Sequence, residues 1–427
     1  MDKKKTLTPM MRQYIEIKEN NPSCILFFRL GDFYEMFFED AELVSKELQL
    51  TLTARMSGNG EKAPMCGVPY HAADAYIARL VKKGYKIAIC EQMQTPEESN
   101  GKLVEREIVR VITPGTVLDE KILRAGSSNY ILSITQNNNN TFGLAYSDIS
   151  TGELSVLEVY STSDLENEVV TINPVEIIMP TALKEVSGVV EAASGFYISY
   201  LDTDYYKQSN INEAIFSQFG IKSLLGIGIS EDAAYVNALG ALLIYIRRTQ
   251  RSSLGHIVEV HQETPSDYMS LDKSTMRSLE LLEPLYEADG NYSLVDILDK
   301  TKTSMGARLL RSWLKRPLKN LQNITKRHDA IEKFVEHKEE IKPIRKALGN
   351  VYDFKRICGR IGAGRANARD LISMKLSLMR IPELKSLLTN VNMQGDKQAS
   401  ELLNELYDRI DDFTDVSSLI ENALVDE

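Results

Sequence analysis

The hydrophobic pattern of this chain changes near Tyr268, and that change constrains the fold more than any other feature. Before it, short apolar runs of strand-like composition, such as Cys24 to Phe28 and Phe142 to Ile149, alternate with segments of helical periodicity. Such alternation is typical of α/β domains. After it, the apolar residues follow a helical period. A chain of 427 residues is long enough for about two to four domains. The sequence therefore predicts a multidomain protein that is first α/β and then all-α.

Breaks in this pattern divide the chain further. Pro114-Gly115 ends the first unit, and in the second a β-meander with a polar hairpin at Gln136 to Thr141 precedes a helix at Glu231 to Arg248. The expected units are a small mixed α/β domain, a linker, a second α/β domain and a helical part, at residues 1–116, 117–127, 128–262 and 263–427.

Composition and charge bear on location and partners. The basic start at Lys3 to Lys5 is followed by no apolar segment of a signal peptide, and no run approaches the roughly 18 apolar residues of a membrane span. We therefore expect a cytoplasmic protein with no membrane partner. The four cysteines have no metal-ligand spacing and are expected to be buried thiols. The net charge is −10, yet residues 301–375 carry 19 Lys and Arg against 7 Asp and Glu. This basic segment fits either direct phosphate contact or a solvated helical face.

Phe33 and Glu35 follow the first apolar run within the sequence G-D-F-Y-E-M-F-F. In an extended chain side chains alternate, so Phe33 and Glu35 point to one side and Tyr34 to the other. An aromatic ring beside a carboxylate could wedge into a base stack while the carboxylate accepts a hydrogen bond from a base. Alternatively, Phe33 and Phe37 are core residues and Glu35 is a solvated charge.

Three arginines of the first domain are candidate contacts to a phosphate backbone: Arg55, Arg106 and Arg110. Arg106 and Arg110 share a parity within an extended segment, so both should face the same way. Each arginine could instead form a surface salt bridge. The stretch Pro64 to Pro69 contains two prolines and a glycine, and we expect a loop of fixed shape there.

The sequence predicts no catalytic residues and no metal site. Gly359 to Arg365 is rich in glycine, but it follows no strand and has no G-K-[ST], so we interpret it as a turn between helices and not as a phosphate loop. Asp148 alone cannot make a two-metal nuclease site, which needs several convergent carboxylates. A nuclease would require such a cluster together with a divalent metal.

Several motifs resemble the start of the bacterial DNA mismatch repair family MutS. They read T-P-M-M-R-Q-Y from Thr8, F-R-L-G-D-F-Y-E-M-F from Phe28, L-T-L-T-A-R from Leu50, P-M-C-G-V-P-Y-H from Pro64, A-I-C-E-Q from Ala88 and L-D-K-T-K-T-S-M-G-A-R-L-L-R-S-W-L-K-R-P-L from Leu298. The resemblance implies that Phe33 and Glu35 are the mismatch-reading element and that Met65 lies near the DNA minor groove. It also implies a mismatch-binding domain, a ribonuclease H-like connector and the first part of a helical lever domain, in which Trp313 is a packing residue.

The resemblance carries further expectations for the intact protein. It implies a homodimer on mismatched double-stranded DNA, a MutL-like repair partner, a nucleoid-associated place in the cytoplasm, and an ATPase that uses ATP and Mg²⁺. Since this chain has no Walker A motif, we expect it to be an N-terminal portion that is not an enzyme and binds no cofactor. The alternative is a MutS-like protein that binds branched DNA or serves as an interaction scaffold without reading mismatches.

Overall fold

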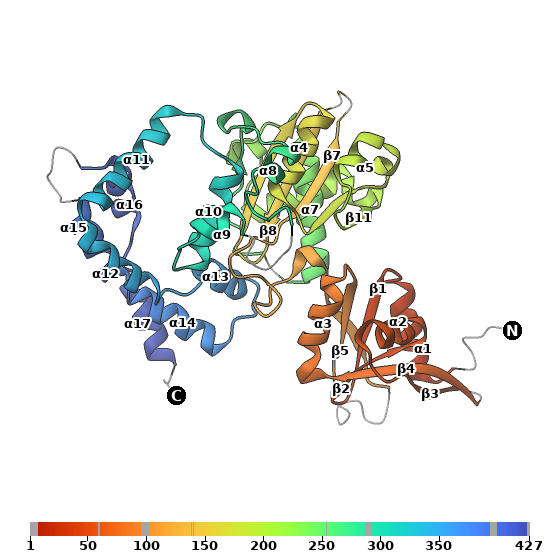
Figure 1. Ribbon diagram of the computed structural model, residues 1–427. Coiled ribbons are helices and arrows are strands. Elements are labelled where there is room, and N and C mark those ends of the chain that lie inside the picture. The colour runs from red at the N-terminus through yellow and green to blue at the C-terminus, as the bar shows by residue number, and fades with distance from the viewer. Residues whose placement is uncertain are drawn as a thin grey trace.

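The computed structural model describes residues 7–58, 60–94, 103–137, 139, 141–252, 254–286, 292–392 and 399–424. Two six-stranded sheets come first along the chain and a set of helices follows, as predicted from the sequence. In Figure 1 the first sheet lies at the lower right, the second above it, and the later helices form an arc on the left.

The first sheet is mixed, with strand order β3-β4-β2-β1-β5-β6. Its strands are β1 (Cys24–Leu30), β2 (Phe33–Phe37), β3 (Thr53–Gly58), β4 (Glu61–Pro69), β5 (Lys86–Gln92) and β6 (Arg106–Ile112). Only β1 and β5 are parallel. Helices α2 (Phe38–Leu48) and α3 (Ala73–Lys82) cover one face, and α1 (Pro9–Glu19) covers part of the other. Strand β1 is apolar on both sides because both of its faces are buried: Phe27 packs in one cluster and Phe28 in the other.

The second sheet has the order β11-β10-β7-β8-β9-β12. Its strands are β7 (Ile131–Gln136), β8 (Phe142–Asp148), β9 (Glu153–Val159), β10 (Glu176–Pro180), β11 (Ile198–Leu201) and β12 (His261–Gln262). The meander β7-β8-β9 is antiparallel and β10 and β11 join it in parallel, which is the ribonuclease H-like arrangement that the resemblance implies. The turn of the expected hairpin lies partly outside the described residues, at 138 and 140.

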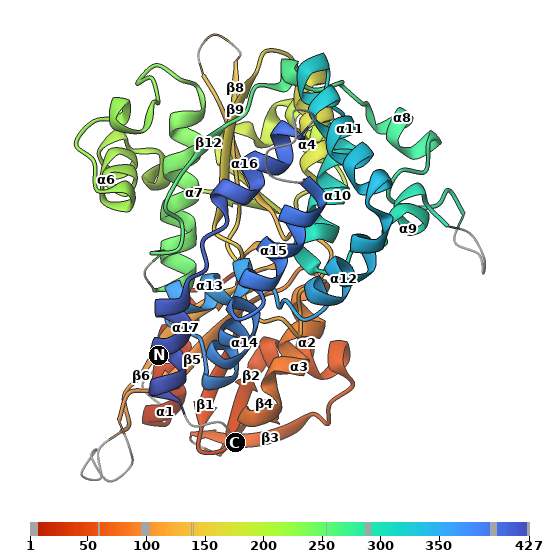
Figure 2. The same ribbon diagram turned by 90° about the vertical axis from the view of Figure 1, so that its left-hand side faces the viewer.

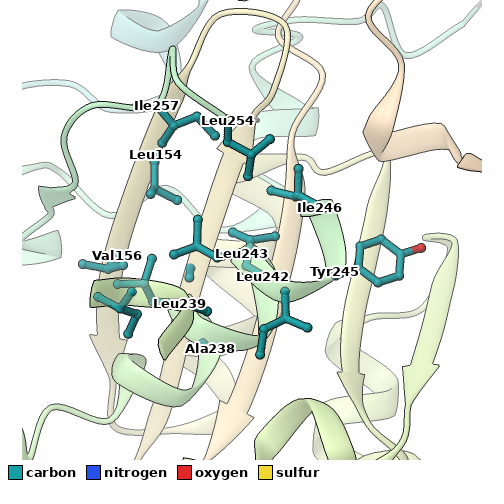
Figure 3. Packing of buried hydrophobic residues seen from close by; sticks show 14 of the residues in the cluster. Leu154, Val156, Ala238, Leu239, Leu242, Leu243, Tyr245, Ile246, Leu254 and Ile257 are labelled. Carbon is teal, nitrogen blue, oxygen red and sulfur yellow. The ribbon is translucent and has the colours of Figure 1, made fainter. Parts of the chain in front are cut away.

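Helices cover both faces of this second sheet. One face packs against α4 (Thr162–Ile172) and α5 (Ser187–Ala192), and the other against α6 (Gln208–Phe219) and α7 (Tyr235–Gln250). Figure 3 shows leucines of α7 interleaved with Leu154 and Val156 of β9. The helix expected at Glu231 to Arg248 thus begins four residues later and ends two residues later.

The regular elements described after Tyr268 are all helices. The helices are α8 (Lys273–Ser278), α9 (Leu294–Leu298), α10 (Ser304–Lys315), α11 (Leu321–Glu336), α12 (Lys338–Leu348), α13 (Phe354–Gly362), α14 (Ala368–Leu378), α15 (Ile381–Asn392), α16 (Glu401–Arg409) and α17 (Thr414–Ala423). Sequence patterns did not predict α15 or α17. Trp313 of α10 is not a core residue: its side chain is 42% exposed, and the Arg327 guanidinium lies 3.7 Å from its ring centroid.

The basic segment 301–375 uses many of its arginines to join the parts of the protein. Arg308 forms a two-point ion pair with Asp353, at 2.6 and 2.8 Å, and also donates to the Ala125 carbonyl of the linker. Arg356 donates to two further linker carbonyls, and Arg316 pairs with Glu168 of the second domain and with Glu263, the first residue after β12. Neither sequence interpretation of this segment, phosphate contact or a solvated face, describes these arginines.

One local prediction was wrong and another held only in part. Pro64 to Pro69 is no loop, because it forms the second half of strand β4 and pairs with β2. Of the turn predicted at Gly359 to Arg365, only Ala363 to Arg365 lie between α13 and α14, since Gly359 and Gly362 belong to α13. A Cβ on Gly359 would overlap the Ser150 carbonyl oxygen, and one on Gly362 would lie 2.6 Å from the His256 Cβ. These glycines allow α13 to approach the second domain closely.

Candidate nucleic-acid interface

Strand β2 begins at a tight hairpin that carries Phe33 out of the core. Gly31 and Asp32 form the two-residue connection between Leu30 and Phe33, and Gly31 has a φ of 58°, which glycine adopts without strain. The Phe33 side chain is 46% exposed, whereas Tyr34 is buried on the opposite face. Phe37 is fully buried, so the core interpretation holds for Phe37 and is wrong for Phe33.

Glu35 lies on the same side of β2 as Phe33 and forms an ion pair with Arg55. The Arg55 guanidinium donates to Glu35 Oε2 at 2.6 Å, reaching across β4 from β3. The residue of β4 opposite Glu35 is Gly67, whose position leaves room for the carboxylate. Within the described residues Arg55 is the only group that donates to this carboxylate, so Oε1 is free to accept a hydrogen bond. Arg55 also neutralises the charge that would otherwise repel phosphates.

Arg106 is a buried side chain that holds three segments together. It donates to the carbonyls of Arg29 and Val104 and to the Gln13 side chain, and its guanidinium lies 4.9 Å from the Phe28 ring centroid. Burial lowers its pKa, with a further lowering from Arg55 nearby. A DNA contact by Arg106 stays a prediction, and these contacts favour a structural role.

Arg110 does not share a face with Arg106. The register between β5 and β6 shifts at Ile89 and Cys90, which is a one-residue irregularity in the pairing. As a result Ile108 and Val111 pack in the same cluster, and the alternation reverses between them. Arg110 therefore points the other way, toward Arg365, whose pKa falls to about 10 through burial and the nearby Arg110 charge.

Met65 and two residues that the sequence interpretation missed complete this region. Met65 lies on β4 opposite Phe37 and is partly buried against the α1 side of the core. Tyr70 is largely exposed, and its backbone N–H donates to the Asp32 carbonyl at the hairpin. The Arg29 guanidinium lies 3.6 Å from the Tyr70 ring centroid. Tyr70 follows the residue paired with Phe33, so two exposed rings lie together where β2 begins and β4 ends. The signal in the sequence was the aromatic residue directly after Pro69.

The Asp148 carboxylate of the second domain accepts hydrogen bonds from the turn that follows its strand and from the segment that precedes β7. It is fully buried and accepts hydrogen bonds from the Ser150 hydroxyl and from the backbone N–H groups of Ser150 and Asn129. Across the described ranges no three His, Cys, Asp or Glu side chains lie close enough to hold a metal ion. In the same residues no helix is long and apolar enough to cross a bilayer.

Comparison with known proteins gives matches along most of the chain. Models of MutS domain I, MutS domain II and MutS domain III match residues 8–121, 129–258 and 274–427. The chain is 41% identical to the DNA mismatch repair protein MutS of Symbiobacterium thermophilum, with 98% of this chain and 48% of the relative covered. It is 42% identical to the proteins of that name from Alkaliphilus oremlandii and Ruminiclostridium cellulolyticum, each with 99% and 48% covered. The chain spans about half the length of the curated relatives it matches.

Proposed function

Because the chain belongs to the MutS family, we propose that it recognises mispaired bases and small unpaired loops in duplex DNA and so initiates mismatch repair. In this proposal Phe33 wedges into the base stack and Glu35 hydrogen-bonds the displaced base. The single observation that carries the proposal is the exposed Phe33 ring beside Glu35 on one face of β2.

The wedge explains how a protein can detect a mispair without reading base edges. Inserting an apolar side chain between base pairs costs about a few kcal/mol of unstacking. The cost is least where pairing is already defective, so a mispaired step is easier to open and kink than a paired one. Phe33 is suited to this because the tight Gly31-Asp32 hairpin fixes the start of its strand, while much of the ring remains free.

The ion pair with Arg55 makes Glu35 compatible with DNA. An unpaired carboxylate next to a phosphate backbone is repelled, whereas the Glu35–Arg55 pair is close to neutral. With Oε2 engaged by Arg55, Oε1 would accept the hydrogen bond from the displaced base. Arg55 in this account positions and neutralises Glu35; it could also approach a phosphate.

The remaining expectations concern the intact protein. We propose that it forms a homodimer, that it works with a MutL-like partner in the cytoplasm close to the nucleoid, and that it hydrolyses ATP with Mg²⁺ outside this chain. The glycine-rich stretch Gly359 to Arg365 does not fit a nucleotide, since two of its glycines pack against the second domain. We also propose the division into a mismatch-binding domain at 1–116, a linker at 117–127, a connector at 128–262 and the first part of the lever at 263–427.

The test is fluorescence anisotropy of the intact protein at fixed salt, with a G·T duplex and its matched control. Phe33→Ala is expected to abolish the preference for the mispaired duplex and to leave weak matched binding. Phe413→Ala is the matched control variant, because Phe413 has the same 46% exposure but lies in the helical part. If wild type and Phe33→Ala bind both duplexes alike, the branched-DNA or scaffold function replaces this proposal.

A further inference from the structure

Glu176 is a buried carboxylate at the junction between the first domain and the connector. It begins strand β10 and has no exposed surface. Its Oε1 accepts hydrogen bonds from the Ser199 hydroxyl and the Tyr245 hydroxyl, both at 2.7 Å. Its Oε2 accepts from the Thr113 hydroxyl and from the Gly115 backbone N–H, the latter at 3.0 Å. All four donors are neutral groups.

The four donors come from two sides of the junction. Ser199 and Tyr245 belong to the connector, on β11 and α7. Figure 3 shows the Tyr245 hydroxyl pointing away from the aliphatic residues around α7. Thr113 and Gly115 belong to the segment that leaves β6, where Pro114–Thr116 forms a short 3₁₀ turn. One carboxylate therefore ties the end of the first domain to the connector.

Close packing and two further hydrogen bonds support this tie. A Cβ on Gly115 would lie 2.7 Å from the Ile131 Cβ, so the turn is pressed against β7. Helix α7 reaches down to the first sheet in Figure 2, and from its end Gln250 donates to the Thr116 carbonyl while Arg251 donates to the Ile108 carbonyl. The chain between the domains is thus held at several points.

We propose that Glu176 is a positioning residue that fixes the orientation of the first domain on the connector and thereby holds Phe33 in register with the duplex. The second half of this statement rests on the proposed mismatch function, and the first half does not. Glu176→Gln should weaken the tie, because an amide has one acceptor oxygen where the carboxylate has two. If that oxygen accepts from Gly115, the Ser199 and Tyr245 hydroxyls lose their acceptor; if it accepts from those hydroxyls, the –NH₂ faces the Gly115 N–H.

Förster transfer between a dye on the first domain and a dye on α13, which packs against the connector at Ser150, measures the placement of the first domain and needs no DNA. Cys358 in α13 is exposed, which corrects the expectation that all four cysteines are buried, and Lys62→Cys places a second thiol on an exposed site of β4. The other three cysteines are buried, so they should label slowly. In wild type we expect one narrow distance distribution, and in Glu176→Gln a distribution at least twofold broader.

If Glu176→Gln folds poorly, two alanine variants of the hydroxyl donors can be compared with each other instead. Thr113→Ala and Ser199→Ala each remove one hydroxyl donor to the same carboxylate, but only Thr113 lies on the first-domain side. We expect Thr113→Ala to broaden the distance distribution and Ser199→Ala to leave it narrow. Equal effects of these two variants, or an unchanged distribution in Glu176→Gln, would overturn the proposal.

Binding to the G·T and matched duplexes separates this inference from the proposed function. We expect Glu176→Gln to lower the mispair preference at least threefold while Phe33 is intact. A broadened distribution with unchanged preference would show that the joint does not serve mismatch reading. If Phe33→Ala has no effect on preference, the proposed function fails, yet the distance measurement still decides whether Glu176 fixes the domains.

Discussion

Asp353→Ala tests how the linker and the helical part are held together. The Asp353 carboxylate accepts two hydrogen bonds from Arg308 and caps α13 by accepting from the Arg356 backbone N–H. The side chains of the Arg308–Asp353 pair are only 7% and 9% exposed. Removing the carboxylate leaves two buried guanidinium groups whose other acceptors are linker carbonyls.

The expected cost follows from that burial. Removing one partner of a buried ion pair costs about 3–5 kcal/mol, because the remaining charge stays buried without compensation. Losing the helix cap adds about 1 kcal/mol, although the two effects overlap because they share a carboxylate. Burial alone would raise the pKa of Asp353, but the hydrogen bonds from Arg308 outweigh it and leave the pKa below its ordinary value. The stabilisation is therefore present at neutral pH and is lost as the pH falls through that lowered pKa.

Urea unfolding of wild type and variant at pH 7 gives the measurement. Asp204→Ala is the control, since Asp204 also pairs with two cations, Lys207 and Arg248, but at an exposed site. Such pairs contribute about 0–1 kcal/mol. The double variant Asp353→Ala with Arg308→Met should recover part of the loss. If Asp353→Ala costs no more than Asp204→Ala, the reasoning about the buried pair is refuted.

Three other variants test separate parts of the account. Arg55→Met should weaken binding to matched and mispaired duplexes alike by about 1 kcal/mol, because the Glu35 carboxylate then faces phosphates without a compensating charge. Adding Glu35→Gln to this variant should restore binding to the matched duplex. Anisotropy that shows no such restoration would contradict this reasoning. Burial lowers the pKa of His256. The free energy of unfolding should therefore fall as the pH drops below about 6.5, because the unfolded chain binds the proton at a higher pH than the folded chain does. Urea unfolding at pH 7 and pH 5 should show a smaller fall between the two pH values in His256→Gln than in wild type. Gly359→Ala should cost about 1–3 kcal/mol by overlap with the Ser150 carbonyl, and an unchanged melting temperature would contradict that contact.

Local patterns predicted the elements of this protein well where one periodicity dominated. The apolar run from Cys24 and the helical periods after Tyr268 both appear as predicted. The stretch Pro64 to Pro69 misled because prolines and a glycine usually mark loops. In the structure Gly67 lies within a strand opposite Glu35, where a Cβ would come within 3.4 Å of the Glu35 Cγ.

Features that depend on distant partners could not be predicted from the sequence. Arg106 and Arg110 are both at even-numbered positions of the chain, and they lie on opposite faces of the sheet only because the pairing of β6 with β5 is irregular between them. The basic segment was visible as a count of charges, but its acceptors lie some 150 to 230 positions earlier, as for Arg316 with Glu168 and Arg356 with Arg124. The shared face of Phe33 and Glu35 was predicted, whereas the Arg55 ion pair needs the order of three strands.

Fluorescence of Phe33→Trp tests the central claim most directly, because it reports contact between this side chain and the bases. The sole tryptophan, Trp313, is first replaced by phenylalanine, and anisotropy establishes that the mispair preference survives. The account predicts strong quenching of the new tryptophan on a G·T duplex, where the ring stacks on bases, and little change on the matched duplex at equal saturation. Equal quenching on both duplexes, or none on the mispaired one, would contradict the claim that the side chain at position 33 reads the mismatch.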